Sequence, residues 1–142
     1  MSKTYIQKAL RERVTEQAKH CCGYCLTHDE NAGAPMEIEH IIPEAAGGLT
    51  EESNLWLACK MCNDYKGDRM VALDEQTGEI VPLFHPRQQR WEDHFSWTEQ
   101  WTVIVGLTPV GRAAVAALNL NRPLVVRARQ RWVQAGGHPP KD

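Results

Sequence analysis

The stretch that decides the fold is residues 21–48, "CCGYCLTHDENAGAPMEIEHIIPEAAGG". It opens with a Cys-x-x-Cys pair, Cys22 and Cys25, and a second pair, Cys59 and Cys62, follows after 33 residues. Two thiolates separated by two residues can point at one centre, and tetrahedral Zn²⁺ takes four such soft ligands. The two pairs therefore predict a zinc site. We expect it to be structural, because four protein ligands leave no open position for water.

The alternative interpretation of these cysteines is a set of redox or unligated thiols, but a redox pair would not need a duplicate. Cys21 is left over from the two pairs and is interpreted as a bystander. The N-terminal segment is charged and lacks the apolar core of a signal peptide, and no apolar run approaches the length of a membrane span. A cytoplasmic protein that does not enter membranes is expected, and there cysteines favour metal binding over disulfides.

The length of 142 residues suits one domain, with a core at about 20–82 and an accessory part at about 83–136. The composition, 42% hydrophobic and 24% charged, is that of an ordinary globular protein. A net charge of −2 does not indicate a nucleic-acid binder. However, residues 84–140 contain seven arginines and only three acids. This excess permits a polyanion to bind there, although a solvated helix surface is the more common explanation of such an excess.

Periodicity predicts a small central βα unit, preceded by a helix and followed by a strand and a helix pair. The last two helices are expected to begin at Thr108-Pro109 and at Asn121, and the final one to end at Gly136-Gly137. The expected elements are a helix over 3–19, a strand over 36–43, an apolar run over 54–58, a helix over 63–72, a turn at 77–78 followed by a strand, a strand over 101–107, and helices over 108–119 and 121–135.

Between the cysteine pairs lies an ordered set of further motifs: acid-His-Ile-Ile-Pro, Gly-Gly, and then Asn-Leu-x-Leu-x-Cys-x-x-Cys-Asn-x-x-Lys-Gly-Asp. In this frame the chain resembles the HNH endonucleases, the ββα-metal or His-Me finger group, in its zinc-stabilised four-cysteine subset. The resemblance covers residues 22–69, about a third of the chain. It implies an α+β fold: a small ββα-metal finger with a four-cysteine zinc site, an N-terminal helix, and a C-terminal strand plus helix pair.

The resemblance also implies roles for four residues. His40 falls on the general base that activates water, and Asn54 on the residue that holds the loop and orients this base. Asn63 occupies the last motif position, commonly His, where it would ligate a catalytic Mg²⁺ or Mn²⁺. Glu39 falls on the acidic ligand of the same cation.

Elementary chemistry supports these roles. Phosphodiester hydrolysis needs a base near neutral pKa and a metal at the phosphate, and a carboxylate with an amide oxygen suits a hard cation. Adjacent strand residues point to opposite faces, so Glu39 and His40 can serve one cation only at a strand end or bulge. The alternative for His40 is a structural histidine near the zinc.

Three cations are candidates for nucleic-acid contact: Lys66 on the helix after the second cysteine pair, and Arg87 and Arg90 beyond the finger. Each has a solvated surface side chain as its alternative. The remaining side chains of the C-terminal half are expected to be structural. They are two loop histidines, three core tryptophans, and an apolar stripe on the last helix: His85, His94, Trp91, Trp97, Trp101, Leu124, Val125, Ala128 and Trp132.

The sequence as a whole predicts a metal-dependent endonuclease that hydrolyses phosphodiester bonds in DNA, with His40 activating water. Two alternatives stay open: a catalytically silent nucleic-acid-binding zinc module, and the same finger acting on RNA. A histidine in an intact motif favours the enzyme, because a binding module needs the cysteines but no base.

Overall fold

The structure is a computed structural model of the chain and describes residues 5–140. Residues 3 and 4, the start of the first expected helix, lie outside this range. The helices and strands are α1 Lys8–Gln17, β1 Glu37–His40, β2 Leu55–Ala58, α2 Lys60–Lys66, β3 Val71–Asp74, β4 Glu79–Pro82, α3 Trp91–His94, β5 Phe95–Thr98, β6 Val103–Gly106, α4 Pro109–Ala117 and α5 Pro123–Gln134, with short 3₁₀ turns at Asp29–Asn31, Glu44–Ala46 and Glu52–Asn54.

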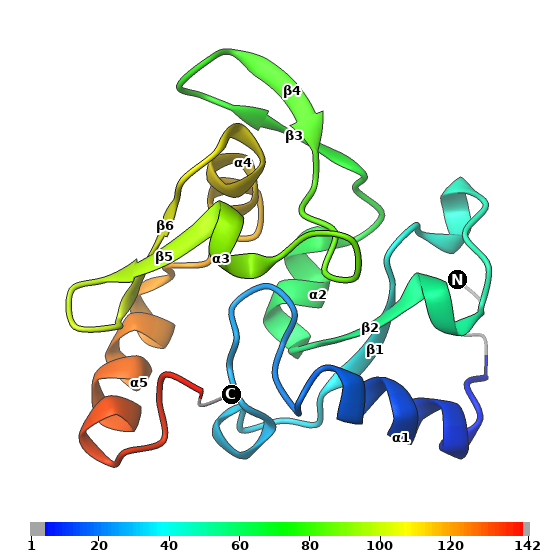
Figure 1. Cartoon of the computed structure of the whole chain (residues 1–142), viewed down its shortest axis with the longest axis horizontal. Helices are drawn as coiled ribbons and strands as arrows, with labels where there is room; N and C mark the ends of the chain where they lie inside the picture. The colour runs from blue at the N-terminus through cyan, green and yellow to red at the C-terminus, as the bar shows by residue number, and fades with distance from the viewer. Residues whose placement is uncertain (1–4, 141–142) are drawn as a thin grey trace.

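The described strands form three separate antiparallel pairs, β1–β2, β3–β4 and β5–β6. The first pair and α2 make the ββα unit, and α1 crosses beside it in Figure 1. The C-terminal helices α4 and α5 lie on the other side of the view, with the β3–β4 hairpin above α4. The α+β class and the ββα finger predicted from the sequence are thus confirmed.

The helix α1 begins at Lys8, later than the sequence pattern indicated. Its apolar stripe is real, because Val14 is buried together with Ile6 before the helix and Ala18 at its C-terminal cap. This stripe packs on Leu55 of β2 and thereby covers one face of the first strand pair.

The prediction of a helix over 63–72 is wrong at both ends. Cys59 caps α2 at its start, where its Sγ accepts a hydrogen bond from the Cys62 amide, so the helix begins at Lys60. Gly67 ends it with φ +52°, a conformation that glycine adopts without strain. Val71 and Ala72 then belong to β3, a strand that the pattern did not indicate.

The C-terminal half contains one further strand than expected, since β5 pairs with β6. Thr108 caps α4 as predicted, accepting from the Gly111 amide, with proline at the first helical position. Asn121 does not cap α5. Its side chain instead hydrogen-bonds both backbone polar groups of Ile104 on β6, at 2.7 Å each. Gly136, with φ +81°, follows the end of α5 as predicted.

Two apolar side chains expected in the core are on the surface, Trp101 with 49% exposure and Leu124 with 77%. Trp101 lies in the β5–β6 turn with a positive φ, and the buried side chains of α5 are Val125 and Arg129. The main core joins all four paired cysteines to apolar residues of the C-terminal half, among them Phe84, Phe95 and Leu118. Within residues 5–140, no helix combines the length and the hydrophobicity needed to cross a membrane.

Candidate active site and metal centre

The four paired cysteines converge at the centre of the finger. Cys22 and Cys25 sit in the loop after α1, which is fastened to β2 by a bond from the Gly23 amide to the Leu57 carbonyl. Cys59 and Cys62 open α2. The four Sγ atoms are buried and lie within 4.8 Å of one another, and those of Cys25 and Cys59 are 3.7 Å apart. A tetrahedral zinc with bonds of about 2.3 Å separates its sulfurs by about 3.8 Å, so this cluster fits zinc.

The fifth cysteine, Cys21, is not part of this cluster. It is buried beside the loop, and its Sγ donates to the Lys19 carbonyl at 3.4 Å. The two Cys-x-x-Cys motifs therefore identify the four cysteines that converge, and they correctly exclude Cys21.

His40 is the last residue of β1, and its imidazole is partly buried. Its Nε2 lies 2.8 Å from the Thr50 hydroxyl and 3.7 Å from the Glu44 carboxylate. In the part of the chain that the structure describes, no hydrogen bond engages its Nδ1. One ring nitrogen is therefore held and the other is left for a reaction partner.

Asn54 fixes the loop that follows His40. Its side-chain Oδ1 accepts from the Ile42 amide at 2.8 Å, and its Nδ2 donates to the carbonyls of Ile42 and Leu49 at 3.0 Å each. Gly48 has no room for a side chain, because a Cβ there would collide with the Ile42 carbonyl and approach the Asn54 amide. The glycine pair in the sequence is thus what allows the loop to close on Asn54.

Glu39 points to the opposite face of β1 from His40. The register with β2 has no bulge, and no contact joins the Glu39 carboxylate to the His40 imidazole in the described chain. The Glu39 side chain, 1% exposed, lies 3.1 Å from the Lys66 ammonium, and neither carboxylate oxygen has a hydrogen bond of good geometry. Burial raises the pKa of Glu39, against the opposing effect of Lys66.

Lys66 is not placed as the sequence suggested. Its side chain is 3% exposed, and its Nζ donates to the backbone carbonyls of His40 at 3.2 Å and Ile41 at 3.1 Å. The ammonium thus fastens α2 to the end of β1 and pairs with Glu39. The prediction of a phosphate contact is wrong for this side chain, because it does not reach the surface.

Asn63 makes a contact that the sequence analysis did not single out. Its Nδ2 donates to Glu37 at 2.7 Å, and both side chains are partly exposed. Glu37 and Glu39 are two residues apart and therefore lie on the same face of β1, the face that α2 covers. The two-residue period along "EIEH" places Glu37 on the same face as Glu39. This period is the signal that would have added Glu37 to Glu39 and Asn63 as a third oxygen donor.

The two arginine candidates differ in how they are held. The Arg87 guanidinium donates to the Leu55 carbonyl at 2.9 Å and to Gln17 at 2.6 Å, and it stacks over Trp56 at 4.8 Å. It therefore fastens the segment after β4 onto β2 and α1. Arg90, by contrast, is exposed, and no ion pair or hydrogen bond of its side chain occurs among the described residues.

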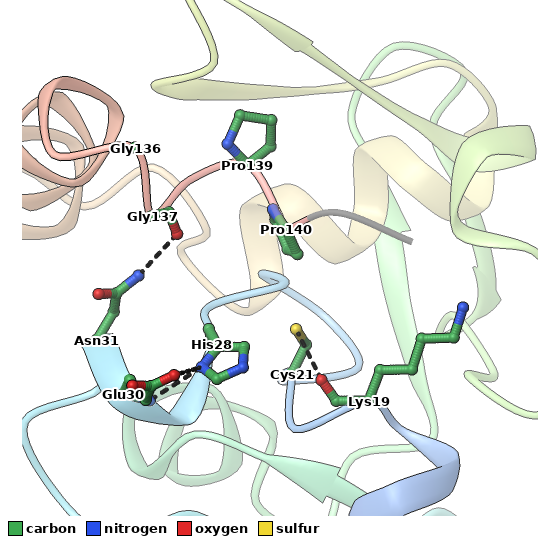
Figure 2. Close-up of a pocket in the computed structure, with 9 residues that line it drawn as sticks. All are labelled: Lys19, Cys21, His28, Glu30, Asn31, Gly136, Gly137, Pro139 and Pro140. Carbon is green, nitrogen blue, oxygen red and sulfur yellow. Dashed lines mark hydrogen bonds and ion pairs between the residues drawn. The ribbon is translucent and has the colours of Figure 1, made fainter.

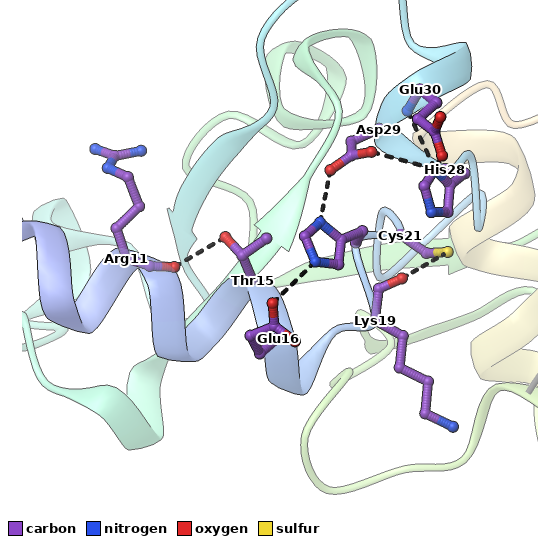
Figure 3. A network of polar contacts seen from close by, with 9 residues as sticks. Arg11, Thr15, Glu16, Lys19, Cys21, His28, Asp29 and Glu30 are labelled. Carbon is purple, nitrogen blue, oxygen red and sulfur yellow. Dashed lines mark hydrogen bonds and ion pairs between the residues drawn. The ribbon is translucent and has the colours of Figure 1, made fainter.

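A second group of metal-ligand types, His28, Asp29 and Glu30, lies near the first cysteine pair. Figure 3 shows it as a chain of polar contacts, which His20 extends to Glu16. The Nδ1 of His28 accepts the Glu30 amide at 3.1 Å and so caps a 3₁₀ turn. Because that lone pair is already engaged, this group is interpreted as a local fold contact.

The same loop borders a pocket of about 360 Å³, which Figure 2 shows between Lys19, Cys21 and His28 on one side and the C-terminal tail on the other. Asn31 bridges the two sides by donating to the Gly137 carbonyl at 3.2 Å. The pocket contains neither His40 nor any of the paired cysteines.

Comparison with known proteins finds a family model that resembles the finger. Residues 22–69 match the family model described as HNH endonuclease, which covers about a third of the chain. No curated protein and no solved structure matches the chain. The matched segment is therefore similar to an HNH endonuclease domain, and its four buried cysteines fit the zinc-stabilised subset of that family.

The cysteine cluster gives the first prediction. Purified protein should contain about one zinc per chain, and Cys59→Ser should lose it and unfold at a much lower temperature, because the binding energy of a structural zinc is folding energy. Cys21→Ser is the matched control and should keep both zinc and melting temperature. Metal analysis and thermal melting check this. Equal melting of the zinc-bound and zinc-free proteins would show that the cluster is not a structural site.

Proposed function

We propose that the protein is a metal-dependent endonuclease that hydrolyses phosphodiester bonds in DNA, with His40 as the general base. The observation that carries the proposal is the way His40 is held. Its Nε2 is engaged by Thr50, its Nδ1 is available, and the loop that follows it is fixed by Asn54. A nucleic-acid-binding module would need the cysteine cluster but none of this arrangement. We also propose that the core at 20–82 and the accessory part at 83–136 work as one domain.

In the proposed reaction the Nε2–H of His40 donates to the Thr50 hydroxyl, so that the Nδ1 lone pair faces the attacking water. The water oxygen bonds to phosphorus as its proton passes to Nδ1, the phosphorus–oxygen bond to the leaving group breaks, and the leaving oxygen takes a proton from solvent. The Glu44 carboxylate, 3.7 Å from Nε2, stabilises the imidazolium that forms.

A divalent cation would supply the charge stabilisation that the leaving oxygen and the phosphate need. The donor set fits a hard cation such as Mg²⁺ or Mn²⁺: carboxylate oxygens of Glu39 without hydrogen bonds, and the amide of Asn63 next to Glu37. Glu39 and Asn63 would hold it. Because Glu39 is buried against Lys66 on the face of β1 opposite His40, its carboxylate would have to exchange the Lys66 ammonium for the cation and open to solvent. Because these protein ligands are few, the remaining positions would be completed by water and substrate.

DNA is favoured over RNA only through the resemblance to HNH endonucleases, and the same chemistry serves either polymer. Phosphate contact is assigned to Arg90, the exposed arginine beside the finger. Cleavage assays with duplex DNA, single-stranded DNA and RNA of the same sequence, under identical salt, distinguish the substrates.

The proposed base leads to the second prediction. His40→Ala should keep zinc, fold and DNA binding while losing about 10²- to 10⁴-fold in cleavage rate, as expected for loss of a general base. Thr50→Val should lose less, because the base remains but its tautomer and orientation are no longer fixed. Plasmid cleavage and binding assays measure both. Wild-type cleavage by His40→Ala would exclude the mechanism.

A third prediction separates the catalytic cation from the zinc. Brief mild chelation should stop cleavage while the four-thiolate zinc stays bound, and Mg²⁺ or Mn²⁺ should restore activity. Asn63→Ala should need a higher metal concentration, whereas Asn63→His should retain activity, because imidazole ligates Mn²⁺ and similar cations. Titration of cleavage rate against metal concentration is the measurement. Full activity in chelator, or an unchanged metal requirement in Asn63→Ala, contradicts this assignment.

The fourth prediction uses the contrast between the two arginines. Arg90→Ala should weaken DNA binding to a similar extent for all sequences and lower the slope of log K against log salt by about 1. Arg87→Ala should instead lower the melting temperature, since its guanidinium holds Leu55 and Gln17. Binding isotherms at several salt concentrations, with thermal melting, separate the effects. An unchanged salt slope in Arg90→Ala would remove it from the interface.

A further inference from the structure

Arg129 of α5 is fully buried, which is unusual for a permanently charged side chain. Its guanidinium donates to the carbonyls of Thr102 at 2.9 Å and Leu120 at 2.7 Å and to the Asn121 side chain at 3.2 Å, and it lies over the Trp97 ring. All of these partners are neutral. Among residues 5–140, neither Arg129 nor Arg122 forms an ion pair with a carboxylate.

The four paired cysteines of the main core become its negative charges once they bind zinc. Leu120, whose carbonyl accepts a hydrogen bond from Nη2 of Arg129, belongs to the same core as the four paired cysteines. Burial lowers the pKa of Arg129, whereas the field of Cys25, with smaller effects from Cys62 and Cys59, raises it. A buried cation is tolerated when an anion compensates it, and a zinc-bound cysteine cluster would supply that anion within the same core.

Arg122 approaches the same cluster from the start of α5. It lines a small cavity of about 170 Å³ together with Cys59, Thr27 and Trp132. Burial alone would lower the pKa of Arg122, but the field of the cysteines, Cys62 foremost, raises it overall. The two arginines are near enough that Arg122 lowers the pKa of Arg129. Two neighbouring like charges, one fully and one partly buried, are stabilised by a nearby anion.

Zinc bound by four thiolates carries a net charge of −2, because the cation cancels only two of the four negative charges. We propose that Arg122 and Arg129 neutralise this charge and so act as positioning residues that retain zinc through the cysteines. Both arginines lie outside the segment that matches the HNH family model. The zinc site of this chain is therefore completed by its C-terminal helix, a role that goes beyond the proposed cleavage reaction and does not depend on it.

The test compares zinc retention in full-length variants. The rate of zinc transfer to a chromogenic chelator is measured for the wild type, Arg122→Gln, Arg122→Lys and Arg127→Gln. Arg127 is the matched control, an exposed arginine on the same helix. Zinc content of the wild type is determined first, so that failure of the zinc assignment is distinguished from failure of charge compensation.

The expected result is faster zinc release in Arg122→Gln, on the order of 10-fold, as for the loss of other groups that support metal ligands. Arg122→Lys should remain within about 3-fold of the wild type, because it keeps the charge, and Arg127→Gln should equal the wild type. Arg129→Met should release zinc faster still. If Arg129→Met does not fold, the comparison of Arg122→Gln with Arg122→Lys and Arg127→Gln tests the proposal by itself.

Three outcomes overturn the proposal: an unchanged release rate in Arg122→Gln, an equal acceleration in Arg122→Lys, or an equal acceleration in Arg127→Gln. The second would mean that side-chain shape and not charge is responsible. The third would mean that a general weakening of α5 is responsible.

Discussion

The convergence of four thiolates on one point is the constraint on which the rest of the structure depends. It brings the loop after α1 to the start of α2, although the two cysteine pairs are 33 residues apart. Between them the described structure has a pair of four-residue strands and three short 3₁₀ turns, and such a strand pair would be marginal alone in water. A structural zinc contributes about 10–16 kcal/mol in small fingers, comparable to the whole stability of a typical domain. With zinc bound at the four cysteines, the short strands and the loop around His40 would be held chiefly by the metal.

The cysteine pairs could be singled out from the sequence because their spacing is local, whereas His40 and Asn54 were singled out through the resemblance to HNH endonucleases. Two residues between thiols, a strand stopped by proline and a glycine pair each act within a few positions. The boundaries of α2 were missed for an equally local reason. Cys59 caps the helix in addition to being a candidate zinc ligand. Cysteine is not among the common N-cap residues, so the sequence did not mark this position as the start of a helix.

The burial of Lys66 and Arg129 could not be predicted, because it depends on contacts between distant segments. A lysine on a short helix is usually solvated, and only the return of β1 beneath α2 brings the carbonyls of His40 and Ile41 within its reach. Arg129 similarly lies on the buried side of α5, where the apolar pattern predicted Leu124, because the carbonyls of Thr102 and Leu120 lie on that side and bind its guanidinium. The periodicity of apolar residues cannot predict a buried charged side chain whose hydrogen-bond partners come from distant segments.

The backbone around His40 is tied from two directions, and this bears on how the proposed base can be rigid in so small a domain. From one side Lys66 binds the carbonyls of His40 and Ile41, and from the other Asn54 binds Ile42 and Leu49. A base contributes to catalysis only when it is held in reach of its proton, and each tie removes freedom before substrate arrives. The buried Lys66–Glu39 pair is costly in desolvation and is weak evidence for stability by itself. Its position next to His40 gives it a clearer purpose: it fixes the strand end from which, under the proposed mechanism, the base acts.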